Sequence, residues 1–303
     1  MSAHLIIVGA GQAAAQSVLT LTQKRFTGRI TVVGDEPYPP YQRPPLSKKY
    51  LSGELDRERL FIRPTTYYEQ QGVTLTLGAR AEQLELSEHR ITLADGRKLH
   101  YDKLLLATGS GVRRVEAPGA DLSGIHYLRT IADADNILGS LDAAKRLVVV
   151  GAGYIGLEVA AVARARGARV TVIEATDRVM ARVVCPEVGN FYRAVHETAG
   201  VEIICETPVS GFAGERRARQ LGCSVRSVRV SMSLICLEYL SAARAAPSVQ
   251  RLPVDPQSRP PGGAFLAPPG NRSTYFLTTN ADSVRECIKG PQMDFLYRYV
   301  GDE

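Results

Sequence analysis

Two glycine-rich turns in this sequence have the residue types and spacing needed to bind the pyrophosphate of a dinucleotide. The first is Gly9-Ala10-Gly11-Gln12-Ala13-Ala14, which follows the apolar run HLIIV at residues 4–8. Gly9 allows a sharp turn, Gly11 lets a phosphate approach the backbone, and the small Ala14 lets a helix pack closely on the strand. The N-terminus of that helix would present unpaired N–H groups to the phosphate. The pattern predicts a strand, a turn and a helix that together form a phosphate site.

The second turn repeats this pattern and is followed by an acid that would favour one nicotinamide cofactor over the other. An apolar run at residues 146–150 leads to Gly151-Ala152-Gly153-Tyr154-Ile155-Gly156, and the next apolar run, residues 170–173, ends at Glu174. A carboxylate there would pair with the 2'-hydroxyl of NAD and repel the 2'-phosphate of NADP, so we expect NADH rather than NADPH. Asp35 follows the corresponding strand of the first unit and could bind an adenosine ribose. The alternative is that both turns are structural and bind no ligand.

The elements that must position these turns are those of an α/β protein. Residues 81–86 and 90–93 alternate polar and apolar side chains around an Asp95-Gly96 turn, and residues 98–100 continue the pattern, which predicts a short β-meander between the two copies. Residues 103–106 predict a buried strand. This order is typical of two Rossmann-like dinucleotide-binding units, a FAD/NAD(P)-binding fold in which one unit holds FAD and the other NADH.

The chain is therefore expected to contain three regions. Residues 1–112 would form the first half of an FAD-binding domain, and residues 113–215 an incomplete NAD-binding domain. Residues 216–303 would be a divergent or out-of-frame tail, atypical in sequence and poorly packed.

Several stretches outside the glycine turns are similar to one known family. The most specific is Pro40-Tyr41-Gln42-Arg43-Pro44-Pro45-Leu46-Ser47-Lys48, followed by Tyr50-Leu51-Ser52-Gly53. Tyr127-Leu128-Arg129-Thr130 and the second glycine motif also fit. Over about residues 1–215 the sequence resembles the FAD-dependent, NADH-utilising ferredoxin reductases of bacterial cytochrome P450 and aromatic-ring dioxygenase systems, in the pyridine nucleotide-disulfide oxidoreductase superfamily. The disulfide-reducing branch carries a redox cysteine pair in this region, and the stretch at 40–53 has no cysteine.

The resemblance implies a set of cofactor-binding residues and a catalytic pair. Lys48 would approach the flavin and pair with Glu158 of the NADH domain, so that a fixed cation stabilises the reduced, anionic ring. The alternatives without a cofactor role are that Lys48 is a solvated loop lysine, that Glu158 is a buried structural glutamate, and that the proline-rich stretch is a surface connector. The cofactor-binding residues would be Gly9, Gly11, Ala13, Ala14, Asp35, Arg43, Lys48, Ala81, Arg129, Gly151, Gly153, Tyr154, Ile155, Gly156, Glu158 and Glu174, with no metal ligand.

The implied reaction has no covalent intermediate. NADH would pass a hydride to flavin N5, and the flavin would release single electrons to a [2Fe-2S] ferredoxin that feeds a cytochrome P450 or a Rieske-type dioxygenase. His126 and His196 are not needed for this chemistry and are expected to be structural.

The resemblance is expected to stop near Glu215. The family would continue through strands to a second flavin motif of the form T-S-D-P-x-I-Y-A-x-G-D and a C-terminal domain that covers the flavin. Neither is present in residues 216–303, where Gly301-Asp302 lies at the end of the sequence. We therefore expect the NADH unit to lack a recognisable final strand layer, and FAD to be held weakly or released. An out-of-frame translation and a genuine divergent domain are both open explanations of the Arg-, Ser- and Pro-rich tail.

Composition and charge exclude several classes of protein. The chain has 303 residues, mean hydropathy of −0.08 and a net charge of +6, of which residues 1–215 contribute only +1, from 25 basic and 24 acidic residues. Scattered arginines in the tail do not make a nucleic-acid-binding face. Residues 4–23 carry no formal charge but are interrupted by polar residues, so we expect no membrane span. The five cysteines include no C-x-x-C pair, which favours a cytoplasmic location with reduced thiols.

Three functions remain open from the sequence. The first is an NADH:ferredoxin reductase. The second is an NADH-dependent flavoprotein with another acceptor, such as a nitrite reductase component or an NADH oxidase. The third is a truncated dinucleotide-binding module or pseudo-enzyme without turnover.

Overall fold

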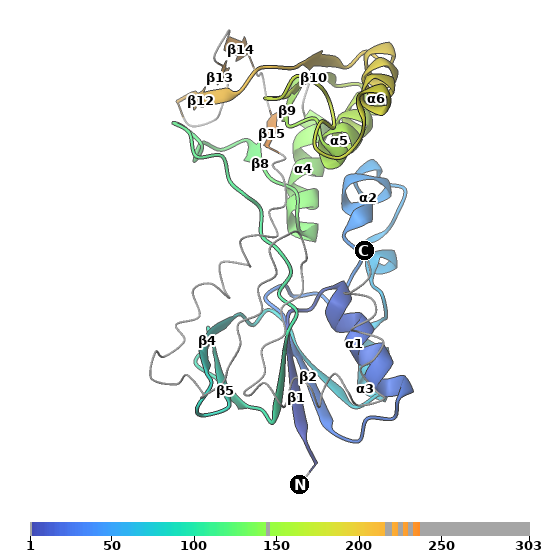
Figure 1. Ribbon diagram of the computed structural model, residues 1–303, viewed down its shortest axis with the longest axis vertical. Helices are drawn as coiled ribbons and strands as arrows, with labels where there is room; N and C mark the ends of the chain where they lie inside the picture. The colour runs from blue at the N-terminus through green and yellow to red at the C-terminus, as the bar shows by residue number, and fades with distance from the viewer. Residues whose placement is uncertain (1, 144–145, 216–219, 224–226, 230–232, 237–303) are drawn as a thin grey trace. The chain divides into compact units, whose positions relative to one another are not determined.

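The structure is a computed structural model that describes residues 2–143, 146–215, 220–223, 227–229 and 233–236. It divides into two compact units, which Figure 1 colours from blue to orange along the chain. Unit 1 contains the described residues up to Gln42 and those of Glu58–Gly111. Unit 2 contains Arg43–Arg57 and the described residues from Val112 onward. Arg43–Arg57, which starts with Pro44 and Pro45 after Arg43 and is called the proline-rich segment below, therefore belongs to the unit that carries the second glycine turn.

Unit 1 is built on a four-stranded parallel sheet. Its strand order is β3-β2-β1-β7, and every neighbouring pair runs parallel. The strands are β1 (His4–Val8), β2 (Arg29–Val33), β3 (Val73–Thr76) and β7 (Lys103–Leu106), and the helices are α1 (Gln12–Gln23) and α3 (Thr65–Gln70). A short 3-10 turn, η2 (Arg57–Leu60), leads back into this unit from Arg43–Arg57.

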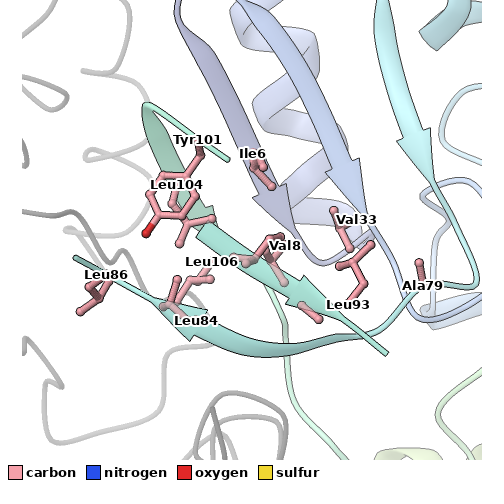
Figure 2. Close-up of a cluster of buried hydrophobic side chains, with 12 residues drawn as sticks. Ile6, Val8, Val33, Ala79, Leu84, Leu86, Leu93, Tyr101, Leu104 and Leu106 are labelled. Atoms are coloured by element: carbon pink, nitrogen blue, oxygen red, sulfur yellow. The ribbon is translucent and has the colours of Figure 1, made fainter. Parts of the chain in front are cut away.

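The two faces of this sheet are covered by different layers. Alternate residues of a strand point to opposite faces, so Leu5 and Ile7 pack against helices α1 and α3 on one side. Ile6 and Val8 pack on the other side, against the antiparallel sheet β4-β5-β6. Figure 2 shows this second interface, where Leu84 of β4 approaches Leu106 of β7. The antiparallel strands are β4 (Ala81–Glu85), β5 (Arg90–Leu93) and β6 (Lys98–His100).

Unit 2 repeats this architecture around a five-stranded parallel sheet in the order β11-β10-β9-β15-β8. The strands are β8 (Ile125–His126), β9 (Arg146–Val150), β10 (Arg169–Ile173), β11 (Glu202–Ile204) and β15 (Ser233–Cys236). The helices are α4 (Ile131–Ala143), α5 (Tyr154–Ala165) and α6 (Pro186–Thr198). An antiparallel sheet of β12 (Val209–Ala213), β13 (Gln220–Cys223) and β14 (Ser227–Arg229) packs Phe212 and Leu221 against Val148 and Ile173.

The proline-rich segment forms two short elements that rest on the helices of unit 2. They are the 3-10 turn η1 (Pro44–Ser47) and helix α2 (Lys49–Ser52). Both contact α4 and α5. Two prolines stand at the start of η1, where their fixed φ fits the turn and the missing N–H groups are not needed.

One expectation about the second unit is wrong. Its sequence shows no recognisable final strand layer, whereas β15 pairs in parallel with both β9 and β8. The β12-β13-β14 sheet also continues past Glu215. These strands were missed because residues 216–237 contain no Asp-Gly or Asn-Gly pair that would mark a hairpin turn.

The α/β fold class, with two Rossmann-like units and a short meander, is confirmed. Most of the tail predicted at residues 216–303, from residue 237 onward, lies outside the described residues. Among the described residues, no helix is both long enough and apolar enough to cross a membrane.

Candidate functional site

The first glycine turn connects β1 to α1, and its two glycines have different reasons to be there. Gly9 has φ +112°, and a Cβ at this position would lie 2.1 Å from the carbonyl oxygen of Ala107. Its N–H donates to Val33 O at 2.7 Å, which fixes the turn on the neighbouring strand. Gly11 is the N-cap residue of α1, and a Cβ there would meet nothing within 4 Å. The fold therefore requires Gly9, whereas at Gly11 it leaves open backbone at a helix N-terminus, which suits a pyrophosphate.

Other predicted residues of unit 1 gather at the carboxyl ends of the parallel strands. Gly34 lies against Ala10 of the turn, where a Cβ would be 2.5 Å from the Ala10 Cβ. Its carbonyl accepts a hydrogen bond from Ala79 N at 2.8 Å, just before Ala81 begins β4. Asp35 is exposed beside Gly34. Ligands of open α/β sheets bind at this edge, so the placement of Asp35 and Ala81 fits an adenosine site.

On helix α1, Ala13 is half-buried and Ala14 is fully buried. The small side chain of Ala14 packs in the interface between α1 and the sheet. Its role in the structure is therefore close packing of the helix.

The glycines of the second turn, between β9 and α5, also divide into positions that the fold requires and a position with open space. Gly151 has φ +99°, and a Cβ on Gly156 would lie 2.0 Å from Gly151 O. Gly153 is exposed, with nothing within 4 Å of its Cβ position. The adjacent Tyr154 is 51% exposed and Ile155 is half-buried. The start of α5 therefore offers open backbone to a phosphate group.

Glu174 is tied to this turn by hydrogen bonds. Its Oε2 accepts from Ala152 N at 2.7 Å, and its Oε1 accepts from Thr176 N and from Thr176 Oγ1, each at 2.9 Å. The carboxylate is thereby fixed beside the glycines at the carboxyl end of β10. The sequence placed Glu174 at this strand end but missed Thr176, whose position two residues later is typical of a local side-chain turn.

Lys48 and Glu158 are brought together. Lys48 Nζ lies 2.8 Å from Glu158 Oε1, with the two side chains 49% and 26% exposed. The second oxygen, Oε2, accepts a hydrogen bond from the buried Ser47 hydroxyl at 2.5 Å. Both carboxylate oxygens are therefore engaged by neighbouring residues of one short segment. This is the pairing that the family resemblance implies, while Ser47 was not identified as part of it.

Arg43 and Arg129 also meet. Arg43 Nη1 donates to Arg129 O at 2.7 Å. The backbone of Arg129 is held in turn by Asp133, whose Oδ2 accepts from Arg129 N at 3.0 Å and from Thr130 N at 2.8 Å. Thr130 Oγ1 accepts from Asp133 N, which closes a capping arrangement at the start of α4. The T-x-x-D spacing was a signal that could have identified Asp133 as the residue that positions Arg129.

A further group of side chains, absent from the sequence prediction, joins α2 to α4. Tyr50 donates to Asp135 Oδ1 at 2.6 Å, and Arg57 Nη2 lies 2.8 Å from Asp135 Oδ2. Burial raises the pKa of the Tyr50 phenol, and the hydrogen bond to Asp135 raises this pKa further. No spacing rule connects residues so far apart in sequence, so only the fold reveals the group.

The predicted cofactor residues are divided between the two units. Unit 1 carries Gly9, Gly11, Ala13, Ala14, Asp35 and Ala81, and unit 2 carries the remaining residues of the predicted set. The described part of the chain contains no cluster of three or more His, Cys, Asp or Glu side chains that could hold a metal. His126 contacts Ser140 Oγ at 3.0 Å, and His196 is buried in α6, where burial lowers its pKa.

Several known proteins are similar to this chain. The family model described as pyridine nucleotide-disulphide oxidoreductase matches residues 3–237, which extends beyond the boundary near Glu215 expected from the sequence. The chain is 44% identical over 205 residues to rhodocoxin reductase of Rhodococcus erythropolis, covering 68% of this chain and 48% of that protein. It is 42% identical over 199 residues to the ferredoxin–NAD(+) reductase component of the p-cumate 2,3-dioxygenase system of Pseudomonas putida, covering 66% and 49%.

A solved structure shows the same fold. The covalent complex of putidaredoxin reductase with putidaredoxin contains a chain that superposes with a TM-score of 0.73 at 36% identity. The match covers 78% of this chain and 58% of that chain. The chain spans about half the length of the curated relatives it matches.

Proposed function

The chain belongs to the pyridine nucleotide-disulphide oxidoreductase family, and we propose that it binds FAD and NADH as an NADH-dependent flavoprotein that reduces a ferredoxin. The observation that carries the proposal is the Lys48–Glu158 pair, 2.8 Å apart, which sets the proline-rich segment on the second dinucleotide-binding helix. A disulfide reductase would need a redox cysteine pair in the same segment, and residues 40–53 contain no cysteine. Two dinucleotide sites with a lysine and no thiol fit electron transfer through a flavin.

The residues present suit the two cofactors. In unit 1, the open backbone at Gly11 would face the FAD pyrophosphate, and Asp35 and Ala81 would bind its adenosine. In unit 2, Gly153 would face the NADH pyrophosphate and Glu174 would accept from its ribose 2'-hydroxyl. Glu174 already accepts from Ala152 N, so the carboxylate is oriented before NADH arrives.

This chain's own residues would bind, orient and stabilise charge. Bound FAD would supply the redox chemistry, by accepting a hydride from NADH and releasing electrons singly. Lys48 would place a positive charge near the ring when it becomes anionic, and Glu158 with Ser47 would hold that charge in position. Arg43 and Arg129 would contribute further binding contacts, with Asp133 fixing the backbone of Arg129.

The electron acceptor is proposed from the relatives. One is named as part of a p-cumate dioxygenase system, and a solved relative is bound to putidaredoxin. We therefore infer a [2Fe-2S] ferredoxin partner that feeds a cytochrome P450 or a Rieske-type dioxygenase. An NADH-dependent flavoprotein with another acceptor is tested by the same experiments, because rubredoxin reductases are also among the relatives.

The test is the visible absorption spectrum of the purified chain after incubation with FAD, removal of free cofactor and anaerobic addition of NADH. Retained flavin bands that bleach with NADH would support a competent hydride-transfer core, and addition of oxidised ferredoxin should then restore the bands. A colourless protein that still binds NADH would contradict the proposal and identify a dinucleotide-binding module without turnover.

Two matched variants sharpen this test. Lys48→Ala should retain FAD but bleach more slowly with NADH, because the charge beside the ring is lost. Lys49→Ala removes the same charge from the next residue, which is also exposed, and should bleach like the unmodified chain. Equal slowing in both variants would show a general effect of charge and would contradict the role of Lys48.

A further inference from the structure

Asp135 connects the segment that carries Lys48 to helix α4. Each of its two carboxylate oxygens is engaged, Oδ1 by the Tyr50 hydroxyl at 2.6 Å and Oδ2 by Arg57 Nη2 at 2.8 Å. The Tyr50 ring is buried, whereas the side chains of Arg57 and Asp135 are 43% and 35% exposed. Tyr50, Arg57 and Asp135 are called the Asp135 anchor below. Its three members come from α2, the end of the Arg43–Arg57 segment, and α4.

The backbone between Lys48 and the anchor forms a continuous hydrogen-bonded piece. Lys48 N donates to Pro45 O at 3.0 Å, and Ser52 N donates to Lys48 O at 2.8 Å. A second attachment comes from Arg166, the C-cap residue of α5, whose Nη1 donates to Ser52 O at 3.2 Å. Movement of Tyr50 would therefore move the backbone from which the Lys48 side chain extends.

The Lys48–Glu158 pair needs such support. Lys48 is half exposed, and a pair of this kind gains little energy from its own charges because solvent screens them and the long side chain loses rotamer freedom. Fixing the backbone of the lysine lowers the entropy that must be lost when the pair forms. The buried Ser47 hydroxyl on Glu158 Oε2 supports the other partner of the pair.

We propose that Asp135 is a positioning residue, which holds Lys48 on Glu158 through Tyr50 and Arg57. The importance of this for hydride transfer rests on the proposed function, whereas the effect on Lys48 itself does not. The anchor would act without touching either cofactor. Its loss should free Lys48 while the Rossmann units remain folded.

The test measures how fast the Lys48 amine is acylated, relative to Lys49, by trace acetic anhydride followed by peptide mass spectrometry. Lys49 is exposed, so it reports the reactivity of a lysine in the same peptide and solvent. Glu158→Gln removes the charge that holds Lys48 and should raise the Lys48:Lys49 ratio by about two- to fivefold, the range for a half-exposed ion pair. Asp135→Ala and Tyr50→Phe should each raise it by a similar factor. Asn136→Ala, an exposed position next to Asp135 on α4, should leave it unchanged.

A double-mutant cycle separates positioning from a general loosening of the fold. If the anchor acts through the Lys48–Glu158 pair, Tyr50→Phe should change nothing further in a Glu158→Gln background. Additive increases would overturn the proposal, because they would show that the anchor affects Lys48 without the pair. An unchanged ratio in both Asp135→Ala and Tyr50→Phe would also overturn it. Tyr50→Phe keeps the buried ring, so it remains informative even if Asp135→Ala is unstable.

Flavin kinetics then distinguish failure of this inference from failure of the proposed function. Labelling requires neither FAD nor NADH, so a colourless protein with the expected labelling pattern would reject the proposed function alone. In a flavin-loaded chain, Tyr50→Phe should slow anaerobic bleaching at saturating NADH by about two- to fivefold, the labelling factor, with no change in the NADH concentration for half-maximal rate. A change confined to that concentration would contradict positioning of Lys48.

Discussion

Replacing Gly156 with alanine should destabilise unit 2 by a calculable mechanism. The added Cβ would lie 2.0 Å from Gly151 O and 3.1 Å from Gly151 C, both backbone atoms that no rotamer change can move away. An ordinary contact of about 3.4 Å would require α5 and the turn to separate by about 1.4 Å. Overpacking of this severity costs about 3 kcal/mol, and the better helix propensity of alanine returns about 1 kcal/mol. The free energy of unfolding should therefore fall by about 2 kcal/mol.

The control for this substitution is Gly139→Ala, in the interior of α4. Gly139 is exposed, and a Cβ there would meet nothing within 4 Å. The same chemical change should therefore stabilise the chain, by about 0.4–1 kcal/mol. Thermal unfolding followed by far-UV circular dichroism would compare the two variants. We expect the Tm of Gly156→Ala to fall by about 4–8 °C and that of Gly139→Ala to rise slightly.

The opposite signs make the comparison decisive. Because both variants convert one glycine into alanine within a helix, propensity alone predicts that both are stabilised. A Tm for Gly156→Ala at or above that of Gly139→Ala would refute the inferred close approach of α5 to the turn. Urea unfolding at 25 °C, compared by midpoint at constant slope, provides an independent measure.

Four further predictions test the site and the stability of the fold. Gly153→Ala should fold normally but weaken NADH binding about tenfold or more, measured by fluorescence titration, because its Cβ would occupy the open space proposed above for the NADH pyrophosphate. Glu174→Ser should raise the use of NADPH relative to NADH, measured as the ratio of kcat/KM values. Burial, and then the charge of Arg29, lower the pKa of His4 below 6.5 in the folded chain. The contribution of His4 to the free energy of unfolding should therefore be fully present above pH 6.5 and should be lost as the pH falls, because the unfolded chain binds the extra proton first. His4→Gln should reduce this pH dependence, measured as urea midpoints between pH 5 and 8. Reading the coding DNA in its other frames should reveal a Gly-Asp flavin motif if the tail is out of frame, and its absence from every frame would reject that hypothesis.

Local patterns allowed most elements near the candidate site to be predicted from the sequence. The apolar runs that end at Gly9 and Gly151 became β1 and β9, and the small residues after them became α1 and α5. These predictions succeeded because strand, turn and helix are contiguous, so their periodicity and punctuation lie within about 20 residues. Strand β15 was missed because its partners, β8 and β9, are distant in sequence. No local turn residues mark where it begins or ends.

The residues that hold Lys48 and Glu158 in place were harder to predict than the pair itself. Lys48 and Glu158 could be paired by resemblance, but Ser47 and Asp135 could not be assigned from spacing. Ser47 contacts a residue 111 positions away, and Tyr50 contacts Asp135 across 85 positions. Such contacts depend on how α2, α4 and α5 pack, which periodicity does not specify. Asp133 is the exception, since its capping spacing from Thr130 is local and readable.

Each glycine motif contains at least one glycine that the backbone needs in order to fold and one glycine that only leaves open space for a ligand. Gly9 and Gly151 have positive φ, and Gly156 has no room for a Cβ, so the fold itself demands glycine at these positions. Gly11 and Gly153 have φ of −100° and −80°, which any residue adopts, and open space around them. A chain that had lost its cofactors would still need the first set for stability, but nothing in the fold would preserve the second. Retention of both Gly11 and Gly153 is therefore the part of the motif that argues for ligand binding, and these two positions are where alanine should remove binding without unfolding the protein.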